Sequence, residues 1–149
     1  MKNGYDIETF DSAEPYKIRI TQIQKFNLHW HSYIEIFYVK KGRILLQTGD
    51  FSFHLDEGHI CFINANTIHS VNQTDLENQI MILQIPTESG RPFFTLRNYK
   101  FNSATYLTDF SKDAAPLEEL QTLLENIYKE SQLKSAGYNQ IILGYINTL

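Results

Sequence analysis

Three histidines and one glutamate stand at positions that can build a metal site. His29 and His31 lie two residues apart, and Glu35 has the same parity. Side chains at i and i+2 of a strand point to the same side, so an unbulged strand would present all three together. His69 follows a later apolar run and completes the set if its strand pairs near the first. Three imidazoles and a carboxylate around an open position suit a divalent transition metal, from manganese to zinc.

A purely structural role for the same cluster stays open. Glu35 could pair with a histidine or a main-chain amide, because an unpaired buried charge is costly. Tyr33 and Phe37 share the parity of the cluster, and they either line a ligand pocket or belong to the core. Trp30 has the opposite parity and is expected to face away from the cluster.

The remaining histidines and the cysteine are given ordinary roles. His54 alternates with apolar residues and is expected on the outward face of its strand. His59 follows the turn at Gly58 and is expected at the surface. Cys61 is expected to be a small buried hydrophobe, and a single cysteine excludes an internal disulfide.

Short strands separated by turns are expected to carry these histidines and Glu35. Alternation over 16–21 is typical of a half-buried strand, and the run 33–39 is apolar on both faces apart from Glu35. Two further runs flank the tight-turn pair Gly49-Asp50. The predicted strands cover 16–21, 33–39, 43–48, 51–55, 59–63 and 80–85, the last one stopped by Pro86. Many short strands at such spacing indicate a sandwich or a barrel.

The C-terminal part has a helical pattern instead. Apolar residues recur at spacings of three and four, and Pro116 fits the first helical turn. The stripe is Leu117, Leu120, Leu124 and Ile127. It either packs on the barrel or forms a dimer seam. A second helical pattern starts at Tyr138 and reaches the last residue without a stop signal, which predicts that the polypeptide continues.

Composition limits the class of protein. The chain has 149 residues, of which 42% are hydrophobic and 13% aromatic, so it is expected to fold as one globular unit. Thirteen basic residues against 17 acidic ones argue against a domain that grips DNA itself. No apolar run reaches the roughly 18 residues of a membrane span. The first residues lack the apolar core of a signal peptide, so a cytoplasmic location is expected.

The stretch from His29 to Gly42 reads H-W-H-S-Y-I-E-I-F-Y-V-K-K-G, which resembles the first cupin motif: H-x-H, three residues, E, six residues, G. Only the glycine that usually opens the motif is missing, and Ile23 stands in its place. The second cupin motif is kept in part, with Gly58 and His69 in register. Its usual proline, glycine and final asparagine are replaced by Asn64, Asn66 and Gln73.

The whole stretch, including DEGHICFINANTIHSV, most resembles the N-terminal cupin domain of AraC-type transcriptional regulators. The resemblance implies a mostly β fold, a double-stranded β-helix or jelly-roll barrel, followed by two C-terminal α-helices. It also implies a sensor barrel over residues 1–112 and a helical dimerisation and linker segment over 113–149. A helix-turn-helix DNA-binding part would follow outside this chain.

The same resemblance implies where ligands bind. In cupin enzymes the residues that match His29, His31, Glu35 and His69 hold the metal. In AraC-type sensors the pocket usually takes an effector such as a sugar, and the candidate ligand-binding residues are His29, His31, Tyr33, Glu35, Phe37 and His69. The helical stripe Leu117, Leu120, Leu124 and Ile127 would support a homodimer.

Three functional classes follow. The first is a non-catalytic effector sensor and dimerisation domain of a transcription regulator. The second is a metal-dependent cupin enzyme, an isomerase or an oxygenase. The third is a dimerisation module with a vestigial pocket. The sensor is preferred, because the helical tail and the incomplete second motif fit it better than they fit an enzyme, so no catalytic residue is assigned.

Overall fold

The computed structural model describes residues 4–6, 9–10, 15–49, 51–74, 77–88, 92, 93, 96, 101 and 115–149. Eight strands are seen there: β1 (Lys17–Thr21), β2 (Lys25–His29), β3 (Tyr33–Lys41), β4 (Arg43–Thr48), β5 (Phe51–Asp56), β6 (Ile60–Ile63), β7 (His69–Gln73) and β8 (Gln79–Pro86). Two helices follow, α1 (Ala115–Leu133) and α2 (Tyr138–Ile146). The expected boundary between residues 112 and 113 lies outside the described residues.

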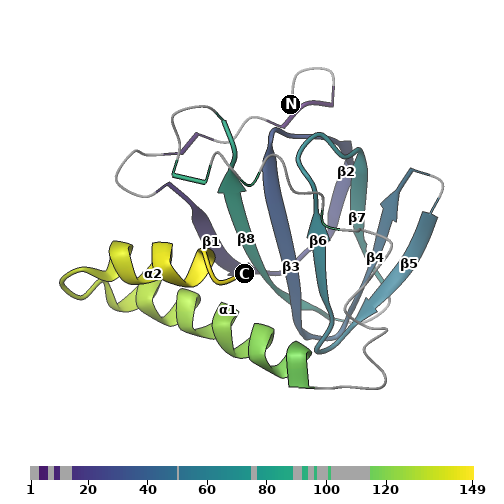
Figure 1. The fold of residues 1–149 in the computed structure, drawn as a ribbon. Helices are drawn as coiled ribbons and strands as arrows, with labels where there is room; N and C mark the ends of the chain where they lie inside the picture. Colours follow the sequence, from purple (N-terminus) through teal and green to yellow (C-terminus); the bar gives the residue numbers. More distant parts are fainter. Residues whose placement is uncertain are drawn as a thin grey trace.

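The strands form two antiparallel four-stranded sheets. One has the order β1-β8-β3-β6 and the other β2-β7-β4-β5. Figure 1 shows the two sheets facing each other, with α1 and α2 side by side against the outer face of the first sheet. This arrangement confirms the predicted fold class: a mostly β jelly roll followed by two C-terminal helices.

Two hydrophobic layers hold the molecule together. Between the sheets, residues such as Phe37, Leu46 and Val71 are buried. Between the first sheet and the helices, Ile36, Leu83 and their neighbours pack against α1 and α2. Strands β3 and β8 are covered on both faces, which explains why their sequences are almost continuously apolar.

The chain changes sheets between β2 and β3. The sequence interpretation assumed an unbulged strand through His29, His31 and Glu35, and this assumption is wrong. β2 belongs to the second sheet, β3 belongs to the first, and the β2–β7 register shifts between Phe26 and His29. Residues 30–32 therefore form a crossing between the sheets. The side chains still converge, because the crossing brings both histidines to the end of the barrel where Glu35 lies.

The helical stripe packs on its own barrel. Leu124 and Ile127 are at most 1% exposed within the layer shared with the first sheet, and Leu117 and Leu120 pack against the same layer. Of the two alternatives for the stripe, the structure therefore shows packing on the barrel. The homodimer role of the stripe stays a prediction, and a dimer could not use the buried pair without uncovering the sheet.

Gly42, the last residue of the first motif, makes the turn from β3 to β4. Its φ is 78°, in the left-handed region, and an added Cβ would overlap the main-chain carbonyl of Glu77. Only glycine satisfies both conditions. Among the described residues, neither helix is long and apolar enough to cross a membrane.

Candidate metal centre

Four buried side chains from four segments meet at one end of the barrel. His29 ends β2, His31 lies in the crossing, Glu35 is in β3 and His69 begins β7. The β2–β7 ladder pairs His29 directly with His69. One ligand atom from each of the four lies within 4.8 Å of the others. The predicted convergence of the four residues is therefore seen, although the strands that deliver them differ from those expected.

Each imidazole is oriented by the main chain. Nδ1 of His29 lies 2.7 Å from the Asn27 carbonyl oxygen. Nδ1 of His31 lies 2.9 Å from the Tyr33 carbonyl oxygen, and Nδ1 of His69 lies 2.9 Å from that of Thr67. A carbonyl only accepts hydrogen bonds, so Nδ1 is the protonated nitrogen in all three rings. When the rings are neutral, each Nε2 carries a lone pair.

The Nε2 atoms face the glutamate. Nε2 of His31 lies 3.3 Å from Glu35 Oε2, and Nε2 of His69 lies 3.4 Å from the same oxygen. The His69 nitrogen is buried and makes no hydrogen bond of acceptable geometry with the described residues. Lone pairs aimed at a carboxylate need a cation among them, either a proton or a metal ion.

The donor set fits a divalent transition metal. Metal–ligand bonds of about 2.1 Å hold neighbouring ligand atoms about 3 to 3.5 Å apart. The two distances from Nε2 to Oε2 fall in that range. Metal-bound histidines usually donate their second ring N–H to a carbonyl or a carboxylate, because this hydrogen bond fixes the ring and its tautomer. All three imidazoles have such a bond from Nδ1.

Charge states agree with a ligand role. Burial by itself would raise the pKa of Glu35, but the close approach of the His31 and His69 rings outweighs it and holds the pKa well below its usual range. Burial lowers the pKa of His29, and its hydrogen bond to the Asn27 carbonyl opposes this only in part. Glu35 is thus ionised and His29 neutral at neutral pH, the forms that bind a metal.

The loop before His69 is held in a defined turn. Asn66 stands where the second motif has glycine, and its φ is 63°. Asparagine is one of the few residues that adopt this left-handed conformation at low cost. The Asn66 amide donates to the His31 carbonyl oxygen at 2.6 Å, and the Thr67 amide donates to that of Asn64. The loop is thereby tied to the crossing that carries His31.

A small cavity adjoins the centre inside the barrel. Its volume is about 20 Å³, which is room for roughly one water molecule. Phe37, a residue of the core between the sheets, also lines it, together with Asp6, Arg19, His29, Glu35 and Gln84. Tyr33 stacks on the His31 ring at a centroid distance of 3.7 Å and so supports the centre from beside it.

Sequence reasoning missed Gln84, Arg19 and Asp6. Gln84 is the one polar side chain in the strand run IMILQI, and it is 1% exposed. A polar residue in a strand that is covered on both faces was the available signal, since such a group needs a partner. Gln84 donates to Glu35 Oε1 at 2.8 Å, so it holds the carboxylate in place.

The other histidines and the cysteine lie outside the centre. His54 is exposed, as expected, and Cys61 is buried, with burial raising the pKa of its thiol. Trp30 faces away, as expected, against Tyr5. His59 is half-buried, not a surface residue: its Nδ1 accepts a hydrogen bond from the Asp56 amide at 2.9 Å and closes the turn.

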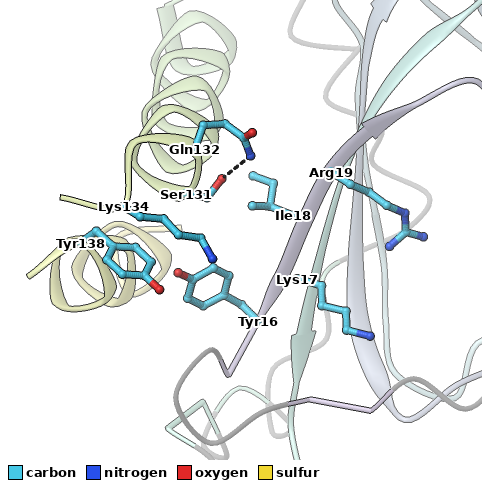
Figure 2. Close-up of a pocket in the computed structure, with 8 residues that line it drawn as sticks. All are labelled: Tyr16, Lys17, Ile18, Arg19, Ser131, Gln132, Lys134 and Tyr138. Carbon is cyan, nitrogen blue, oxygen red and sulfur yellow. Dashed lines mark hydrogen bonds between the residues drawn. The ribbon is translucent and has the colours of Figure 1, made fainter.

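A larger hollow of about 270 Å³ lies outside the barrel, between β1 and the two helices. Figure 2 shows Tyr16 and Ile18 pointing from β1 toward the helices, and Ser131, Gln132 and Tyr138 on the helical side. The hollow is separate from the four ligands and contains none of them.

Three solved structures are similar to part of this chain. Among solved structures, a cupin-2 domain protein from Shewanella frigidimarina NCIMB 400 is 24% identical, with a TM-score of 0.44 over 46% of this chain and 69% of that one. A cupin superfamily protein from Desulfitobacterium hafniense DCB-2 is 9% identical, with a TM-score of 0.46 over 48% and 68%. Oxalate decarboxylase from Bacillus subtilis, described with Mn(II) centres, is 16% identical with a TM-score of 0.45, and the match covers 48% of this chain and 21% of the enzyme.

No curated protein matches the chain. The family model for the AraC-like ligand binding domain, however, matches residues 16–140, which is most of the sequence and includes all four candidate ligands. The chain therefore belongs to the family of AraC-like ligand binding domains.

Proposed function

We propose that this ligand-binding domain is the effector sensor of an AraC-type transcription regulator and that it senses its effector beside a divalent metal ion. The ion would be held by His29, His31, Glu35 and His69. The observation that carries this proposal is the orientation of the three imidazoles, with every Nδ1 bonded to a carbonyl and the Nε2 side turned toward one carboxylate.

A metal ion held by these residues would supply positive charge to which a ligand atom could bind. The chain's own residues do the rest. Gln84 orients Glu35, the loop at Asn66 fixes His69, and Tyr33 covers one face of His31. The cavity beside the centre admits only a small polar group, so a sugar ring would have to bind at its mouth.

The partners belong to the same proposal. A homodimer and a DNA-binding part beyond this chain, acting in the cytoplasm, are expected of an AraC-type regulator. A metal-dependent cupin enzyme is the second candidate function, and it rests on the same donor set. Among the described residues, no further acid or base outside the ligands and Asp6 lines the cavity, which favours the sensor.

The test is the metal content of the purified chain after incubation with a mixture of Mn²⁺, Fe²⁺, Co²⁺, Ni²⁺ and Zn²⁺ and removal of free metal. Elemental analysis is expected to find about one ion per chain. His31→Ala is expected to lose most of it. His54→Ala is the matched control, because His54 is an exposed histidine on β5, away from the centre.

Equal metal content in the parent chain and in His31→Ala would refute the metal centre. Turnover of a substrate by the loaded parent chain, lost in His31→Ala but not in His54→Ala, would favour the enzyme over the sensor. A metal-dependent change in DNA binding by the complete regulator, abolished by His31→Ala, would favour the sensor.

A further inference from the structure

Arg19 is linked to the candidate metal centre by hydrogen bonds through one side chain, that of Gln84. It lies in the middle of β1, where it pairs with Ile82 of β8. Figure 2 shows Arg19 and Lys17 extending from β1 on the side away from the helices, opposite to Tyr16 and Ile18. On that side the Arg19 Nη1 donates to Gln84 Oε1 at 3.0 Å, while Gln84 Nε2 donates to Glu35 Oε1 at 2.8 Å. The guanidinium and the centre are thus separated by one amide group.

The amide orientation of Gln84 is forced. Arg19 only donates hydrogen bonds and the ionised Glu35 only accepts them, so the Gln84 oxygen must face Arg19 and its nitrogen must face Glu35. Gln84 is almost completely buried and cannot turn without breaking both bonds. Arg19 is therefore held against the cavity wall in a defined position.

Arg19 lacks a counter-ion in the described part of the chain. No carboxylate oxygen of a described residue lies within 4.0 Å of its guanidinium, and Gln84 is the one hydrogen-bond acceptor found for its five N–H donors. Its side chain is half-buried and lines the cavity. A partly desolvated guanidinium with free donors is a ready site for an anion, above all for a planar carboxylate that accepts two parallel hydrogen bonds.

The charges around the cavity lead to the same class of ligand. The charged side chains lining it, among those described, are Arg19 and the carboxylates Asp6 and Glu35. His29 also lines it, and a histidine that binds a metal is neutral. A divalent ion at the centre would turn the single negative excess into a single positive one. One monovalent anion then neutralises the site. The cavity volume of about 20 Å³ has room for roughly one water-sized group, so a ligand would place one small polar atom there and no ring.

We propose that the pocket selects a small carboxylate, with one end of the carboxylate held by Arg19 and the other directed at the metal centre. The metal part of this statement rests on the proposed function above, whereas the Arg19 contact rests on the geometry of β1, Gln84 and the cavity. The effector would then be an acid, not a neutral sugar.

The experiment uses matched pairs of probes, acetate with acetamide and pyruvate with pyruvamide. They are titrated into the chain, with and without one equivalent of Zn²⁺, while amide NMR shifts report Kd. With zinc, each carboxylate is expected to bind at least about tenfold more tightly than its amide, which is about 1.4 kcal/mol. Arg19→Gln should remove most of this preference without lowering zinc content. Lys17→Gln, the same charge change two residues away on β1, should keep it.

Arg19→Lys gives a second reading, because it keeps the charge but loses the planar fork. It should retain only part of the preference. Equal binding of carboxylate and amide, or a preference that survives in Arg19→Gln with a native-like spectrum, would overturn the anion site. If the chain takes up no zinc but still prefers carboxylates through Arg19, the metal centre fails and the anion site stands. If the chain takes up zinc but shows no carboxylate preference, the anion site fails and the metal centre stands.

Discussion

Replacing Ile127 by alanine tests whether the helical stripe stabilises the single chain. Ile127 is fully buried, between α1 and the first sheet. The substitution removes three side-chain carbons, worth about 2.4 kcal/mol of transfer free energy at about 0.8 kcal/mol each. A residual cavity adds to this, so a loss of about 3 kcal/mol is expected, inside the range of about 2 to 5 for such changes. For a chain of this size the midpoint of thermal unfolding should fall by about 6 to 12 °C.

The assay is thermal unfolding at several protein concentrations, together with sedimentation velocity. Leu133→Ala is the matched control, because Leu133 is an aliphatic residue on the same helix that is 61% exposed. Its effect should stay within about 0.5 kcal/mol. If Ile127 packs within the chain, the Ile127→Ala loss is independent of protein concentration. An unchanged midpoint, or a loss that follows dimer dissociation, would refute packing of Ile127 within the single chain.

Two further predictions concern turns of the barrel. Burial lowers the pKa of His59, the charge of Asp56 opposes this and Arg43 reinforces it. The folded pKa thus lies below the unfolded value of about 6.5, so the stability from the neutral ring is present above that pH and is lost as the pH falls through the folded pKa. His59→Asn keeps an acceptor for the Asp56 amide and should show a flatter loss of urea stability than the parent below pH 6.5; parallel curves would exclude this role for His59. Asn66→Val should lose about 1 to 2 kcal/mol, because its φ of 63° strains a β-branched residue, whereas Asn66→Gly should be nearly neutral; similar urea midpoints for the two variants would show that the turn conformation is not limiting.

The strands and helices were predictable where local patterns were strong. Alternation, the Gly49-Asp50 turn and the three-four spacing after Pro116 each arise from one element and its nearest neighbours, and the structure confirms β4, β5, β6, β8, α1 and α2 close to their predicted bounds. The strand β2 was merged with β3, and β7 was not separated from its loop. A local pattern could not separate these strands from their neighbours, because their ends depend on pairing with distant strands. β2 pairs with β7, and β3 pairs with β8.

The four clustered residues of the candidate site were predictable from the sequence, but the residues that support them were not. The histidines and Glu35 are recognisable by type and motif, so the centre could be named from the sequence. Gln84, Arg19 and Asp6 are brought to it by pairing between β1 and β8 and by the segment at Trp30. These contacts join residues far apart in the sequence, and hydrogen-bond orientation enters only with the coordinates.

Strand β3 gives the domain a physical means of passing information from the centre to the helices. Glu35 and Phe37 face the barrel interior, while Ile34 and Ile36 of the same strand belong to the layer packed against α1 and α2. Lys40, at the far end of β3, is ion-paired with Glu125 of α1, and Gln121 of α1 donates to the Gly58 carbonyl oxygen at 2.7 Å. A ligand that displaces Glu35 therefore acts on the same strand whose other face packs against α1 and α2.

The size of any such coupling is set by differential affinity. A ligand shifts the equilibrium between two positions of β3 and the helices only by the ratio of its affinities for the two. Each tenfold difference in affinity is worth about 1.4 kcal/mol. The charge-assisted bonds to Glu35 and Arg19 are strong enough to supply a difference of that order, because bonds to charged groups contribute about 1.5 to 3 kcal/mol. If the centre and the helices are coupled, a substitution that shifts the equilibrium between two positions of the helices must also change metal or carboxylate affinity, even though it does not touch the centre. Ile127→Ala meets that condition, so measuring Zn²⁺ affinity in this variant tests the coupling directly: an unaltered affinity in a variant that stays folded would mean that the helices do not sense the centre.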